Sequence, residues 1–89
     1  MMSIPELNKH PAVLEVIDER ERQISKWGDE INDDLWTPLD WHEMISDYNG
    51  WARRMAAMGS NDKARKRYIQ IATLAIAAVE SIDRRANKT

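Results

Sequence analysis

Arginine, lysine and tryptophan residues recur at helical spacing in the first third of the chain. Arg20, Gln23 and Trp27 would share one face of an α-helix, because residues three and four apart are neighbours on a helix surface. Arg22 and Lys26 stand beside them. An arginine fork suits a phosphate group, and an indole ring can stack on a base. The pattern predicts a nucleotide pocket, although Arg20 could instead form a salt bridge with a carboxylate on another helix.

Three aromatic residues and a basic run follow. Trp41, Tyr48 and Trp51 could also stack on a base. The run Arg65-Lys66-Arg67 stands where a helix is expected to begin, and free backbone N–H groups there favour an anion. We therefore add Arg67 and the three aromatic residues to the candidate ligand-binding residues. The alternative is that the basic run pairs with the acidic first half of the chain.

Carboxylates supply only weak candidates for metal ligands. Asp33 and Asp34 lie in a segment without helical periodicity, and Glu43 and Asp47 are four residues apart. Oxygen ligands suit magnesium or calcium, but the spacing does not match a calcium-binding loop. A solvated acidic loop and an ordinary polar helix face explain these residues better than metal binding does, so we predict no metal site. The chain has no cysteine, which excludes disulfides and zinc–thiolate sites.

The spacing of apolar residues and capping signals predicts three helices, over about 11–27, 38–58 and 62–86. Thr37 is the expected cap of the second helix, with Pro38 at its first position and Asp40 completing a capping box. Gly50 inside that helix suggests a close approach by a neighbour or a kink. We expect an all-α protein with an arm at 1–10, one domain at 11–86 and a tail at 87–89.

Each helix has an expected buried stripe. The first comprises Val13, Val16, Ile17, Arg20, Ile24 and Trp27. The second comprises Trp41, Met44, Ile45, Tyr48, Ala52 and Met55, widened by Trp51 and Met58. The third helix is apolar on nearly every face between residues 68 and 82, and two other helices cannot enclose it. We therefore expect the chain to assemble through its third helix into a homodimer or a larger homo-oligomer.

Composition and charge narrow the class of protein. With 89 residues, the chain is one small domain. Residues 1–50 carry 4 basic and 12 acidic side chains, and residues 51–89 carry 9 and 3, so opposite charges are available for pairing within or between subunits. An isoelectric point near 5.6 argues against direct DNA or RNA binding. No membrane span or secretory signal is expected, and we predict a cytoplasmic location.

Several of these residues also resemble a known group of sequences. The group has an "ERxRQ…KWG…DD" first half, matched by Glu19-Arg20, Arg22-Gln23, Lys26-Trp27-Gly28 and Asp33-Asp34. Its last helix is matched by Ile69-Gln70-Ile71-Ala72 and by Ala77-Ala78-Val79-Glu80-Ser81-Ile82-Asp83-Arg84. These small proteins are found widely in bacteriophage genomes. The resemblance covers roughly residues 13–85 and implies a phage protein that works in the host cytoplasm.

Longer members of that group are similar to the all-α nucleoside triphosphate pyrophosphohydrolases (MazG-like), which bind magnesium through E-E-x-x-E and E-x-x-D motifs. Placed by the preceding tryptophan, the first motif falls on Ser46, Asp47 and Gly50, and the second on Arg67 and Gln70. Only Asp47 is acidic, which argues against magnesium-dependent hydrolysis. The resemblance implies a helical scaffold on which Arg67 could hold a phosphate without metal.

Three functions follow from these observations. The first is a non-enzymatic phage protein that captures a nucleotide-derived ligand, such as a second messenger of host immunity, and needs no cofactor. The second is a phage inhibitor that binds a host protein through a tryptophan-rich surface. The third is a magnesium-dependent nucleotide pyrophosphohydrolase whose displaced ligands would be Glu43, Asp47, Glu80 and Asp83. We favour the first.

Overall fold

The computed structural model describes residues 6, 8–27 and 35–87, apart from the side chain of Trp27. The chain forms α2 (Pro11–Trp27), α4 (Pro38–Ala57) and α5 (Asn61–Asn87), and the described residues include no strand. The predicted all-α architecture is confirmed, with helix ends within a residue or so of those expected. The predicted metal candidates Asp33 and Asp34 lie outside the described residues.

The start of α4 shows why the helix begins there. The Thr37 hydroxyl accepts a hydrogen bond from the Asp40 backbone N–H at 3.2 Å, and the Asp40 carboxylate accepts one from the Thr37 N–H at 2.9 Å. Pro38 occupies the first turn, where its missing N–H has no partner to lose. The predicted capping box is therefore confirmed. Gly59, with φ of 77°, turns the chain from α4 into α5, in the left-handed region that favours glycine.

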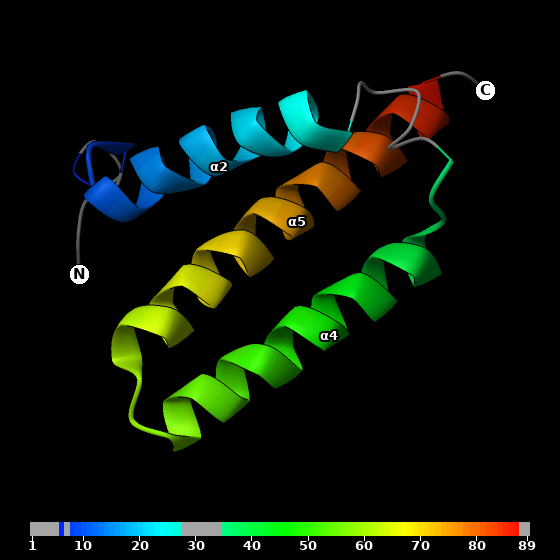
Figure 1. Ribbon diagram of the computed structural model, residues 1–89. Helices are drawn as coiled ribbons and strands as arrows, with labels where there is room; N and C mark the ends of the chain where they lie inside the picture. The colour runs from blue at the N-terminus through cyan, green and yellow to red at the C-terminus, as the bar shows by residue number, and fades with distance from the viewer. Residues whose placement is uncertain (1–5, 7, 28–34, 88–89) are drawn as a thin grey trace.

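The last helix lies in the middle of the fold. Figure 1 shows α5 between α2 and α4, and α5 contacts both of them. The core between α4 and α5 is built around Trp41, Leu74 and Ala77, with further apolar side chains packed against them. These include Met44, Ile45 and Tyr48, so the predicted inner stripe of α4 is confirmed.

The face that α2 turns to α5 differs from the predicted one. Arg20 and Gln23 are buried, whereas Ile17 is 50% exposed and Ile24 is 43% exposed. The side of α2 that faces α5 carries Arg20, which bonds to Glu80 of α5 at 3.1 Å, and not the two isoleucines. The prediction that Ile17 and Ile24 are buried in this chain is wrong.

Two features of α4 also differ from expectation. A Cβ added to Gly50 would meet no atom within 4 Å, so the expected close approach by a neighbour is wrong, and the alternative of a kink stays a prediction. Trp51 and Met58 are exposed and do not widen the buried stripe. Apart from these differences, the second helix packs as predicted. In the part of the chain that the structure describes, no helix has the length and apolar character needed to cross a membrane.

Candidate functional site

A groove lies between the second half of α4 and the first turns of α5. It has a volume of about 390 Å³ and is lined by Met55, Lys63, Lys66, Arg67 and Gln70. The four α5 residues share one face because they are spaced by three and four positions. The groove therefore presents three cations and one amide, and the described residues of its lining include no carboxylate.

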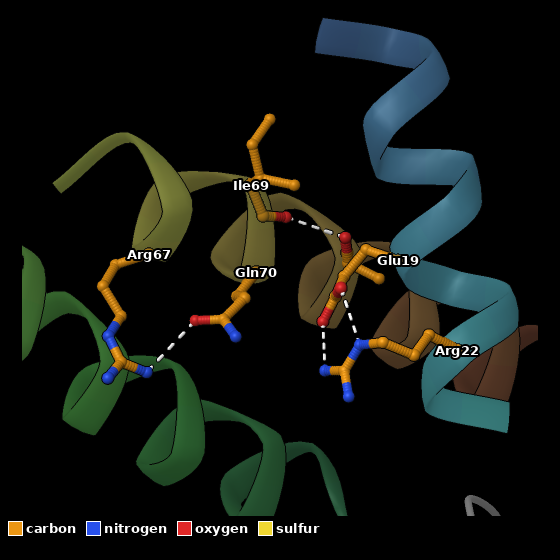
Figure 2. Close-up of polar contacts among 6 residues, drawn as sticks. Glu19, Arg22, Arg67, Ile69 and Gln70 are labelled. Carbon is orange, nitrogen blue, oxygen red and sulfur yellow. Dashed lines mark hydrogen bonds and ion pairs between the residues drawn. The ribbon is translucent and has the colours of Figure 1, made fainter. Parts of the chain in front are cut away.

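Arg67 is held against the aromatic side chains of α4. Its guanidinium carbon lies 5.1 Å from the centre of the Trp51 ring and 5.7 Å from that of Tyr48. The two rings contact each other with centroids 5.0 Å apart. Arg67 also donates a hydrogen bond to the Gln70 side-chain oxygen at 3.2 Å (Figure 2). Cation–π contacts and the amide orient this guanidinium without neutralising its charge.

The basic side chains of the groove make no ion pair in the described part of the chain, although the charge of Lys66 acts on the Glu19 carboxyl. Among the described residues, no Asp or Glu forms an ion pair with Lys63, Lys66 or Arg67. Most other arginines of the fold are paired, as Arg65 is with Glu15. A cluster of unpaired cations next to aromatic rings is a favourable place for a phosphate-bearing ligand, because charge-assisted hydrogen bonds are about twice as strong as neutral ones.

Arg22 lies on α2, across the fold from Arg67, and is already paired. Its guanidinium donates to both oxygens of Glu19, at 2.9 and 2.5 Å. This bond holds the pKa of the Glu19 carboxyl below its usual range, and the charges of Arg22 and Lys66 lower it further. Figure 2 shows Gln70 between Arg67 and this pair. Arg22 therefore borders the basic region, but its charge is balanced.

The other residues predicted for the pocket are dispersed. Arg20 is buried and bonded to Glu80, as the salt-bridge alternative expected. Gln23 is buried, and its side-chain oxygen has no hydrogen-bond partner among the described residues. Trp41 is a core residue, so its rings are covered. Lys26 is exposed on α2, and the side chain of Trp27 lies outside the description.

The structure thus brings together Arg67, Tyr48 and Trp51 and separates them from the first-helix candidates. Sequence reasoning missed Lys63, Lys66 and Gln70 as members of the same face. Their spacing of three and four residues, relative to Arg67, was the available signal.

The two carboxylates of α4 that are weak metal candidates lie at the surface. Glu43 and Asp47 border an open hollow together with Asp40, and Asp40 is engaged in the capping box. In the described segments, no three His, Cys, Asp or Glu side chains are placed to hold a metal ion together. Of the two further acidic candidates, Glu80 faces Arg20 and Arg84, and Asp83 is exposed.

Fold and groove together define an all-α, three-helix protein with a basic groove in which one lining residue, Arg67, packs against two aromatic rings. Comparisons of the chain with protein-family models, with curated proteins and with solved structures found no match.

Proposed function

We propose that this chain is a binding protein that holds a phosphate-bearing, nucleotide-like ligand in the groove between α4 and α5. The observation that carries the proposal is the position of Arg67, stacked on Tyr48 and Trp51 beside two lysines that form no ion pair with the described residues. Phosphate oxygens would accept hydrogen bonds from Lys63, Lys66 and Arg67. The indole of Trp51 would stack on a base, since base–aromatic stacking tolerates any base.

The charge of the groove favours binding without metal over hydrolysis. Magnesium is held by carboxylates together with substrate phosphates, whereas the lining of this groove is basic. The basic lining of the groove and the resemblance to phage proteins together support capture of a nucleotide-derived second messenger of host immunity in the host cytoplasm. The rival proposal of a tryptophan-rich docking surface is less well supported, because Trp41 is buried and Arg67 lies over Trp51.

Calorimetric titration with cyclic dinucleotides, ADP-ribose derivatives and nucleoside triphosphates tests the proposal. At least one of these ligand classes should bind, and Arg67→Gln should lower its affinity at least tenfold, which corresponds to about 1.4 kcal/mol of binding free energy. Lys9→Gln removes one positive charge from an exposed residue outside the groove and is the matched control. Absence of binding at high micromolar ligand, or equal losses in the two variants, would contradict the proposal.

We also propose that the partner of α5 is a second copy of this chain. Tyr68 and Val79 of α5 are 52% and 57% exposed, and Ala72, Ala75 and Ile82 lie on the same stripe and are also exposed. Spacings of four and three residues are those of a helix–helix seam. Neither α2 nor α4 covers this stripe, so the excess of apolar surface expected from the sequence is present in the fold.

The exposed stripe of α5 lies away from the groove. Nine residues of α-helix make about two and a half turns, so Gln70 and Val79 point to opposite sides. Pairing through the stripe therefore leaves the groove open.

Sedimentation or light scattering tests the self-association. The wild-type protein should have at least twice the monomer mass, and Val79→Glu should reduce it to the monomer, because a charge would be buried in the seam. Ala57→Glu, at an exposed position of α4, should leave the mass unchanged. A wild-type protein that is monomeric at high concentration would contradict this part of the proposal.

A further inference from the structure

A second hollow lies on the exposed side of α4 and is lined in part by Trp51, the residue whose ring contacts the groove residue Arg67. Its volume is about 580 Å³, and its lining includes Ser46, Asp47, Gly50, Trp51 and Arg54. Trp51 connects it to the basic groove, because the Arg67 guanidinium lies 5.1 Å from the Trp51 ring. The two hollows are therefore neighbours on one surface, with the stacked pair of Arg67 and Trp51 between them.

Gly50 forms part of this hollow, and the packing of the fold does not account for it. It lies in the middle of α4 and is exposed. Its φ is not positive, since Gly59 is the glycine with that geometry, and no atom lies within 4 Å of an added Cβ. Glycine is the poorest helix former apart from proline. Its effect here is to leave the helix surface bare beside an indole that is 39% exposed.

We propose that this hollow receives the planar ring of the ligand whose phosphates lie in the groove, an inference that rests on the proposed function. The ring would lie over Gly50 and against the exposed part of Trp51, where stacking supplies affinity. The glycine permits this because any larger side chain would occupy the space of the ring. Phosphates attached to the ring's sugar would then reach Arg67 on the other side of Trp51.

Asp47, at the edge of the hollow, would determine which kind of base binds there. Asp47 forms no hydrogen bond or ion pair with the other described residues, so its carboxylate is available as an acceptor. A carboxylate needs N–H donors from its partner. Guanine has two adjacent donors on one edge, and adenine has only its amino group there. The hollow therefore assigns a guanine-type ring to the ligand.

The experiment compares GDP, ADP and inorganic pyrophosphate by calorimetry. Wild-type protein should bind GDP at least tenfold more tightly than pyrophosphate, and more tightly than ADP. Gly50→Leu and Gly50→Gln, two substitutions that favour the helix, should each bring GDP affinity down to that of pyrophosphate and leave pyrophosphate affinity unchanged. Asp47→Asn should abolish the preference for GDP over ADP. The control is Asn49→Leu, at the neighbouring exposed position, which should bind all three probes as wild type does.

The outcomes separate this inference from the function on which it rests. Equal affinity for GDP and pyrophosphate, or unchanged GDP binding in both Gly50 variants, would overturn the ring site and leave the phosphate groove intact. Loss of pyrophosphate binding in the Gly50 variants would also overturn it, because the effect would then not be confined to the ring. If no probe binds the wild-type protein, both proposals fail.

Discussion

Replacing Arg20 tests whether the buried arginine of α2 is structural or belongs to the ligand site. Its side chain is 11% exposed and bonds to Glu80, which is 42% exposed and lies 3.9 Å from Arg84. A hydrogen bond between charged groups contributes about 1.5–3 kcal/mol. The lower value of this energy range applies to the Arg20–Glu80 bond, because Glu80 retains contact with water and with Arg84. Burial of the aliphatic stem adds about 0.8 kcal/mol per CH₂.

Arg20→Ala should therefore lower the free energy of unfolding by about 3 kcal/mol, from the hydrogen bond and two methylenes together. Arg20→Met retains the apolar stem and should lose only about half of that. The assay is urea unfolding at one fixed protein concentration, since the proposed self-association would make the midpoint depend on concentration. Both variants, when folded, should bind the ligand of the groove as wild type does. A loss of less than ~0.5 kcal/mol together with abolished ligand binding would refute the structural assignment of Arg20.

Three further predictions concern stability. Hydrogen bonds from arginines hold the pKa values of Glu15 and Glu19 below their ordinary value in the folded protein. The stabilising effect of the two ionised carboxylates is therefore present above about pH 4.3 and is lost as the pH falls further. The urea midpoint should be level from pH 7 to 5 and fall below pH 4, and a level profile down to pH 3 would contradict this. Thr37→Ala removes the cap of α4 and should cost about 1 kcal/mol in the same assay, whereas Thr37→Ser should be nearly neutral. Leu74→Ala, at a fully buried position, should cost 2–5 kcal/mol, and a cost below 1 kcal/mol would show that the core is not packed as described.

The helices could be predicted from the sequence because their signals are local. The capping box at Thr37 and the turn at Gly59 depend on residues within a few positions of each other, and such contacts form in any fold that contains the segment. The inner stripe of α4 was predictable for a similar reason, since a period of three to four residues fixes which side chains share a face.

The side of α2 that meets α5 could not be predicted from periodicity. An apolar stripe that includes Ile17 and Ile24 must be covered, but the sequence does not say whether a helix of the same chain or a second molecule covers it. The ion pair between Arg20 and Glu80 joins residues 60 positions apart, and such a pairing depends on how the helices are oriented. The candidate site was predicted only in part for the same reason, because Arg67 meets Tyr48 and Trp51 across the turn between α4 and α5.

The position of the anion site can be tested most directly by nuclear magnetic resonance of ¹⁵N-labelled protein during titration with inorganic pyrophosphate. The account predicts saturable shifts of backbone amides in the first turns of α5, around Lys63, Lys66 and Arg67, and of the Trp51 indole N–H. The chemical shifts of backbone amides near Arg20 in α2 should not change. Shifts centred on Arg20 and Lys26, or no saturable shift at millimolar pyrophosphate, would contradict the assignment of the groove between α4 and α5 as the anion-binding site.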